Sequence, residues 1–79
     1  MKITIKLLAT YEKLLPEGVS GGVCEIEVLE GTKASDILKK YNVPVDGNTV
    51  ILVNGRTPPE DELLQPGDIL CAFPVATGG

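Results

Sequence analysis

The sequence contains no histidine and no tryptophan, and its 79 residues include only one phenylalanine, two tyrosines and two cysteines. Histidine is the commonest general base and a common metal ligand in proteins, so its absence disfavours an enzyme or a metal site. The few aromatic rings are too few for stacking on bases, and the seven lysines and arginines are scattered along a chain of net charge -4. We therefore expect neither a nucleic-acid partner nor a bound metal, and the acidic bias suits a partner with a basic surface.

Long apolar runs and a cysteine framework are also missing. No segment approaches the length needed to cross a membrane, and Lys2 and Lys6 interrupt the apolar residues of segment 1–8, unlike a signal peptide. Cys24 and Cys71 each fall within an apolar, strand-like run rather than in the loops of a secreted mini-protein. We expect reduced thiols, no membrane partner and a cytoplasmic location.

Alternating apolar and polar residues predict two strands in the first part of the chain. The alternation covers residues 2–8 and again 23–29. Gly21 and Gly22 directly precede the second run, which indicates a hairpin-type connection, and residues 11–15 within that connection predict a short helical turn. The two strands should therefore pair antiparallel.

After Gly31 the repeat of apolar residues changes from every two residues to about every 3.6 residues, the period of a helix. One face of the predicted helix carries Ala34, Ile37, Leu38 and Tyr41. Thr32 is the expected N-cap, because its side chain could accept a hydrogen bond from the N–H of Ser35. Pro44 disfavours helical geometry in the residue before it, so the helix should end at Asn42.

The second half of the chain predicts two further strands. Residues 49–53 form an apolar run that ends in an Asn-Gly turn, and a brief pairing across that turn should stop at Pro58. Residues 60–65 predict a single helical turn. Residues 69–73 are almost wholly apolar, as expected for a strand at the centre of a sheet.

This order of elements defines a fold class. If the last strand lies beside the first, one helix covers one face of a mixed sheet of four or five strands, which is the α+β architecture of the β-grasp, or ubiquitin-like, roll. We expect one domain over residues 1–73 and a flexible tail over residues 74–79.

Several residue groups carry a resemblance to a known family. They are the segment Val53–Arg56, the segment Leu64–Asp68, the pair Phe73 and Pro74, and the terminal pair Gly78 and Gly79. In this order, and over essentially the whole chain, the pattern resembles the MoaD/ThiS family of ubiquitin-like sulfur carriers, and most of all the small subunit of molybdopterin synthase. One departure is that Val75 follows Pro74, where the molybdopterin-type tail often has a second proline.

The resemblance implies a carrier rather than an enzyme. In the family, an E1-like enzyme uses ATP to adenylate the terminal carboxylate, and a sulfur donor converts that carboxylate to a thiocarboxylate. Carried over to this chain, Gly79 is the residue that reacts, and Gly78 lets an extended tail thread a narrow channel. The chain itself would bind no cofactor, since ATP belongs to the activating partner.

The implied partners are the E1-like enzyme, the sulfur donor and a sulfur acceptor such as the large subunit of a synthase. The most similar pathway is synthesis of the molybdenum or tungsten cofactor. Thiamine thiazole synthesis, tRNA thiolation and cysteine synthesis remain alternatives. So do a ubiquitin-like modifier that forms isopeptide bonds, and a β-grasp interaction domain whose tail is inert.

Five residues are candidates for partner contact. By similarity to the ubiquitin-like register, Leu52 and Phe73 should lie on the sheet face that the helix leaves open, although apolar strands leave their parity ambiguous and a core position is the alternative. Pro74 should end the sheet pairing and stiffen the tail, which continues with Val75. Arg56 would pair with an acidic partner or remain a solvated base.

Two further groups predict structural roles. The acidic cluster Glu60, Asp61 and Glu62 is expected to be a solvated turn rather than a catalytic or metal group. Cys71 is expected to be a packed strand thiol rather than a nucleophile.

Overall fold

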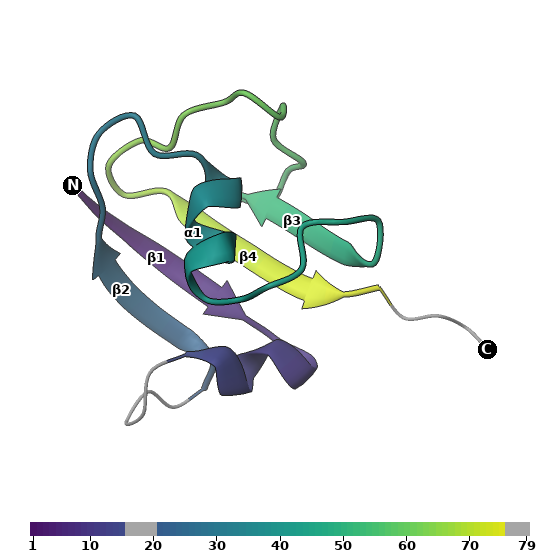
Figure 1. Cartoon of the computed structure of the whole chain (residues 1–79). Coiled ribbons are helices and arrows are strands. Elements are labelled where there is room, and N and C mark those ends of the chain that lie inside the picture. The colour runs from purple at the N-terminus through teal and green to yellow at the C-terminus, as the bar shows by residue number, and fades with distance from the viewer. Residues whose placement is uncertain (16–20, 76–79) are drawn as a thin grey trace.

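A computed structural model describes residues 1–15 and 21–75. The elements are β1 (Lys2–Leu7), the 3-10 helix η1 (Ala9–Leu14), β2 (Val23–Glu27), α1 (Ala34–Lys40), β3 (Thr49–Val53) and β4 (Ile69–Pro74). Within these residues four strands form one sheet in the order β2-β1-β4-β3 (Figure 1). β1 pairs antiparallel with β2 and parallel with β4, and β3 pairs antiparallel with β4. The predicted mixed β-grasp sheet is confirmed.

The core lies between α1 and the two central strands. The parallel register places Ile5 beside Leu70 and Leu7 beside Ala72, and all four side chains are fully buried. Removal of each large apolar side chain from water stabilises the fold by about 1.5 to 3 kcal/mol. The whole buried cluster is Ile3, Ile5, Leu7, Leu15, Ala34, Ile37, Leu38, Val43, Val53, Leu64, Leu70 and Ala72.

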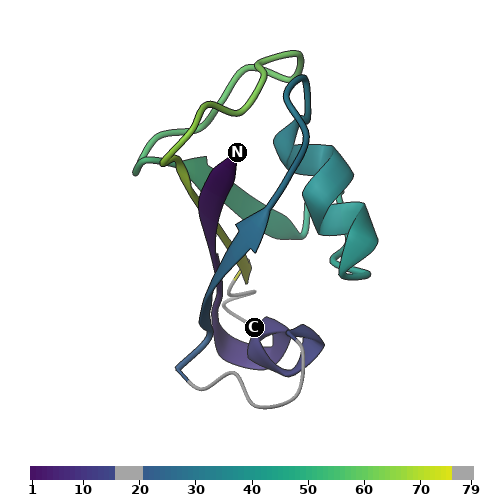
Figure 2. The ribbon, with the colours of Figure 1, turned by 90° about the vertical axis from the view of Figure 1, so that its left-hand side faces the viewer.

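α1 covers one face of the sheet and leaves the other free (Figure 2). Ala34, Ile37 and Leu38 are its buried residues, as the 3.6-residue period predicts. The helix ends at Lys40 with Tyr41 as its C-cap, and Asn42, the residue predicted to stop it, adopts a left-handed φ of 63°. The N–H of Val43 then donates to the carbonyl of Leu38 at 2.9 Å, which satisfies one of the last free carbonyls of the helix.

The start of α1 differs from the prediction. The N-cap is Lys33, whose backbone N–H donates to the carboxylate of Asp36 at 3.0 Å. The prediction that Thr32 is the N-cap is wrong, because its hydroxyl donates instead to the carbonyl of Leu29 at 2.6 Å. A turn before the helix thus uses the hydroxyl, and Asp36 stabilises the helix start as an acidic side chain in the first turn.

The second strand is shorter than the predicted 23–29. β2 ends at Glu27, and Leu29 beyond it is 83% exposed. In place of the predicted helical turn at 60–65, the N–H of Glu62 donates to the carbonyl of Pro59 in a tight turn, and the N–H of Leu64 donates to the carbonyl of Thr32 at 2.8 Å. The backbone of this segment therefore bonds to the residues before α1 rather than to itself.

Gly22 occupies a position where a side chain does not fit. Its φ is +71°, its carbonyl accepts the N–H of Leu7 at 2.8 Å, and an added Cβ would overlap the carbonyl oxygen of Leu7. Its neighbour Gly21 has a similar φ of +76°, but an added Cβ there would meet nothing within 4 Å. The two glycines form a matched pair that separates backbone strain from steric overlap.

We predict that Gly21→Ala lowers the free energy of unfolding by about 1 to 2 kcal/mol, the usual cost of a left-handed alanine. Gly22→Ala should lose roughly a further 1 to 3 kcal/mol, because the methyl group also displaces the β1–β2 connection. Urea denaturation followed by circular dichroism measures both. Equal losses for the two variants would contradict the steric argument.

Candidate functional site

Strand parity decides which residues face away from the helix. Val53 of β3 and Leu70 of β4 are buried beneath α1, and side chains alternate along each strand. Leu52 and Phe73 therefore lie on the opposite face and are partly exposed. The structure resolves the ambiguity that the apolar sequence left open.

An apolar patch covers the β3–β4 half of this free face. We call it the open-face patch, and it consists of Val50, Leu52, Ile69, Cys71 and Phe73. The register joins Val50 to Phe73 and Leu52 to Cys71 across the two strands. Because Ile69 is exposed and the other four side chains are partly exposed outside the buried core, the patch has the apolar character that a docking site requires.

A charged border adjoins the patch on β1. Lys6 is the register partner of Cys71, and Thr4 is that of Ile69. A hollow of about 430 Å³ is lined by Lys6, Leu52, Asn54, Gly55, Ile69 and Cys71. A partner on this face would thus meet an apolar surface bordered by an ammonium group.

The thiol of Cys71 is free and half-buried within the patch. Burial raises the pKa of Cys71 above its ordinary value, and the nearby Lys6 ammonium opposes part of that rise. A raised pKa leaves less thiolate at neutral pH, so the thiol is a poorer nucleophile than a free cysteine.

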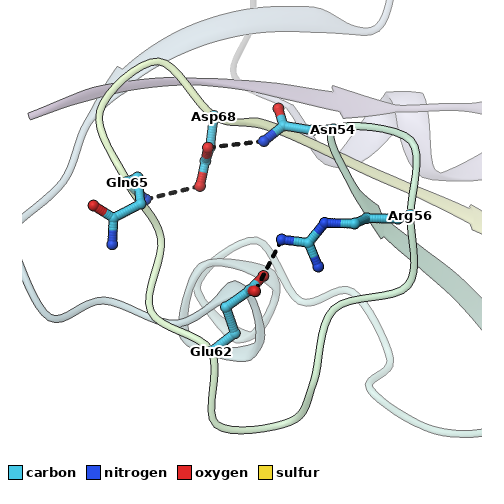
Figure 3. A network of polar contacts seen from close by, with 5 residues as sticks. All are labelled: Asn54, Arg56, Glu62, Gln65 and Asp68. Carbon is cyan, nitrogen blue, oxygen red and sulfur yellow. Dashed lines mark hydrogen bonds and ion pairs between the residues drawn. The ribbon is translucent and has the colours of Figure 1, made fainter.

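A polar network connects the two turns at one end of β3 and β4 (Figure 3). The Asn54 amide donates to the carboxylate of Asp68 at 2.9 Å, and its oxygen accepts the N–H of Ile69 at 2.9 Å. The other carboxylate oxygen of Asp68 accepts the N–H of Gln65 at 2.7 Å. The sequence predicts both turns, but the hydrogen bonds that join Asn54 to Asp68 and Ile69 appear only in the structure. Asn54 and Ile69 both line the hollow on the open face.

Arg56 is paired within the chain. Its Nη2 donates to Oε1 of Glu62 at 2.9 Å, and the Arg56 side chain remains 57% exposed (Figure 3). Arg56 is not among the residues that line the open-face hollow. Leu52 lines this hollow and Arg56 does not, so the structure does not bring the Arg56 side chain into the hollow. The guanidinium is exposed to solvent, as one of the two alternatives expects, and it also has an acidic partner within the chain.

Pro74 does not end the sheet pairing, contrary to the prediction. It is the last residue of β4 and the register partner of Thr49, and the N–H of Val75 still donates to the carbonyl of Asn48 at 2.9 Å. In an antiparallel pair, alternate residues bond across the ladder. Pro74 falls at a position whose N–H would point away from β3, so its missing donor breaks no bond to that strand.

The predicted reactive residues Gly78 and Gly79 lie outside the described residues. Of the candidate tail residues, Pro74 and Val75 are described, and Val75 is 41% exposed. Among residues 1–15 and 21–75, no group of three or more histidine, cysteine, aspartate or glutamate side chains is arranged to hold a metal ion. The same residues include no helix that is long and apolar enough to span a membrane.

The sheet order and the helix on one face define a ubiquitin-like protein, and comparisons with known proteins agree. No family model and no curated protein matches the sequence. Among solved structures, a Pyrococcus furiosus protein assigned as molybdopterin converting factor, subunit 1, has a TM-score of 0.71 and 29% identity, covering 92% of this chain and 95% of that one.

Two structures from Haloferax volcanii share the fold at lower identity. SAMP1 has a TM-score of 0.75 with 18% identity over 100% of both chains. Small archaeal modifier protein 1 has a TM-score of 0.67 with 16% identity, covering 92% of this chain and 95% of that one. The resemblance of the chain to the MoaD/ThiS-like group of ubiquitin-like proteins is confirmed.

We predict that Cys71 reacts slowly with iodoacetamide in the folded protein. In a Cys24→Ser variant, where Cys71 is the only thiol, alkylation at mildly alkaline pH should be slower than in the same variant unfolded in urea. The raised pKa means that the thiolate forms at higher pH in the folded chain. Mass spectrometry over a pH series measures the rate of alkylation. Equal or faster alkylation of the folded chain would contradict the raised pKa of Cys71.

Proposed function

We propose that this chain is a sulfur carrier whose Gly79 carboxylate is activated by an E1-like enzyme and converted to a thiocarboxylate. The observation that carries the proposal is the similarity, over 92% of the chain, to a protein assigned as molybdopterin converting factor, subunit 1. We propose molybdopterin synthesis as the pathway, with the large subunit of a synthase as the sulfur acceptor.

The proposed chemistry takes place at the tail and uses no side chain of this protein as a catalyst. A carboxylate oxygen of Gly79 attacks the α-phosphorus of ATP, and pyrophosphate leaves. Hydrosulfide from the sulfur donor then attacks the acyl carbon, AMP leaves with the bonding electrons, and loss of the sulfur-bound proton gives the thiocarboxylate. ATP and the catalytic groups belong to the activating enzyme, so this chain contributes the carboxylate and the docking surface.

The position of the last strand supports this division of roles. β4 lies between β1 and β3, and backbone pairing continues as far as Val75. Residues 76–79 follow, and even a fully extended four-residue segment spans no more than about 14 Å. A partner that reacts with Gly79 must therefore dock close to Val75, and the open-face patch, which includes Phe73, provides an apolar surface at that distance.

A second candidate function is a ubiquitin-like modifier. Two of the structures that share the fold are named as archaeal modifier proteins. The same adenylation would serve a modifier, but the acyl carbon of Gly79 would then be attacked by a lysine amine rather than by sulfur. The tail sequence is compatible with both outcomes.

We predict that incubation with ATP, a cognate E1-like enzyme and sulfide raises the mass of the full chain by the difference between one sulfur atom and one oxygen atom. Fragmentation should map that difference to Gly79. A variant without Gly78 and Gly79, and a reaction without ATP, serve as controls. Absence of both the mass gain and the adenylate, with an enzyme that is active on its known partner, would refute the proposal.

Proteomics of the producing cells separates the two candidates. A carrier should be recovered with a thiocarboxylate at Gly79. Branched peptides that join Gly79 to the side-chain amine of a lysine in another protein would instead establish the modifier.

We further predict that Leu52→Ala and Phe73→Ala each weaken binding to the activating enzyme by about 1 kcal/mol or more, because both remove apolar contact area from the patch. Leu29→Ala is the matched control, since Leu29 is 83% exposed and lies outside the patch. Calorimetry measures binding, and thermal unfolding measures stability. A large loss of stability with unchanged binding would show that these residues are structural.

A further inference from the structure

The outer edge of β3 is open at its middle. The N–H of Asn54 donates to Ile69 and that of Val75 donates to Asn48, so the even-numbered residues of β3 bond to β4 and the odd-numbered ones face outward. Among the described residues, the N–H and carbonyl of Ile51 have no backbone partner at this edge. The edge can therefore accept a further strand at Ile51.

Internal hydrogen bonds close both ends of this edge. The N–H of Thr49 donates to the carbonyl of Asp46 at 3.2 Å, and Val53 exchanges two backbone bonds with Arg56, at 2.8 and 3.2 Å. An added strand would thus pair over a short length, centred on Ile51. The internal hydrogen bonds at Thr49 and Val53 set the limits between which that strand can pair.

An apolar groove of about 430 Å³ runs along the same edge. Its apolar walls come from α1, β3, the loops on either side of β3 and the residue that follows β4. They include Ala34, Val45, Ile51, Pro58, Pro59 and Val75. Val45 and Val75 are each 41% exposed. These walls offer apolar contact to a chain that pairs with Ile51, in addition to the main-chain hydrogen bonds.

Carboxylates border the groove and determine the charge that it accepts. Glu60 and Glu62 both line it, and Glu62 is neutralised by Arg56 at 2.9 Å. Glu60 is exposed and has no ion-pair partner among the described residues. A second copy of this chain, with a net charge of -4, would be repelled, whereas a basic side chain would be attracted.

We propose that the β3 groove binds an extended segment of a partner protein, which adds to β3 as a strand and places a lysine or arginine against Glu60. The central residue of that segment exchanges two backbone hydrogen bonds with Ile51, and antiparallel pairing puts its side chain on the same face as that of Ile51. The residues around the central one are apolar. This role goes beyond sulfur transfer, because it requires no reaction at Gly79.

The test is a titration of the isotopically labelled full chain with a synthetic peptide, followed by amide NMR. The peptide is Val-Ile-Lys-Val-Thr with blocked ends. One matched peptide carries glutamate in place of the lysine, and the other carries an N-methyl group on the backbone amide of the lysine. Addition of the first peptide should shift the Ile51 amide downfield and perturb groove residues such as Val45 and Val75. Both matched peptides should bind more weakly, because one loses the charge pair and the other a hydrogen bond.

Charge-reversal variants test the contact with Glu60. Glu60→Lys should raise the dissociation constant of the lysine peptide about three- to fivefold at low salt, the size expected for an exposed ion pair. Glu30→Lys makes the same change in net charge outside the groove, so it should have a clearly smaller effect. Equal effects of the two variants would mean that only net charge matters, and the site would be refuted.

Three other outcomes would also overturn the proposal. The first is an unchanged Ile51 amide at millimolar peptide. The second is a response centred on Lys6 and Cys71, which would place the peptide on the open face. The third is a concentration-dependent shift of Ile51 in the free protein, which would identify a second copy of this chain as the occupant. None of these outcomes bears on the thiocarboxylate, so the failure of this proposal and that of the sulfur-carrier proposal are distinguishable.

Discussion

The parallel pairing of β1 with β4 is the contact on which the rest of the structure depends. It joins residues that are far apart in the sequence, such as Ile5 and Leu70, and it buries the side chains at the centre of the sheet. Parallel neighbours require a long crossover connection, and here α1 lies within that connection and covers the buried face. β2 and β3 are consequently left as the two edges.

The central position of β4 also determines how the tail is presented. A strand held on both sides is rigid, and the hydrogen bond from Val75 to Asn48 extends that rigidity past Pro74. Gly79 is four residues beyond Val75, so the proposed reactive group can be no more than about 14 Å from that residue. Because the reaction needs no side chain of this protein, docking geometry and the glycines of the tail would determine whether a partner reaches Gly79.

The two candidate interaction surfaces flank β3 and differ in how they would bind. The open-face patch offers apolar side chains such as Leu52 and Phe73, whereas the outer edge offers the main chain of Ile51 beside a carboxylate. Side-chain contact depends on the shape and apolar area of the partner, and strand addition depends on an extended partner backbone. The two surfaces could therefore serve different partners.

The sequence by itself determined the strands and the helix α1, though not all of their ends, since periods of two and 3.6 and turns such as Asn54-Gly55 depend on neighbouring residues. It also predicted the fold class, and the family resemblance that includes Gly78 and Gly79 suggested the proposed chemistry. Only the tertiary structure decided that Leu52 faces outward, that Arg56 pairs with Glu62 and that the backbone pairs past Pro74. These features depend on which strand or loop lies alongside, and such contacts between distant residues leave no periodic signal in the chain.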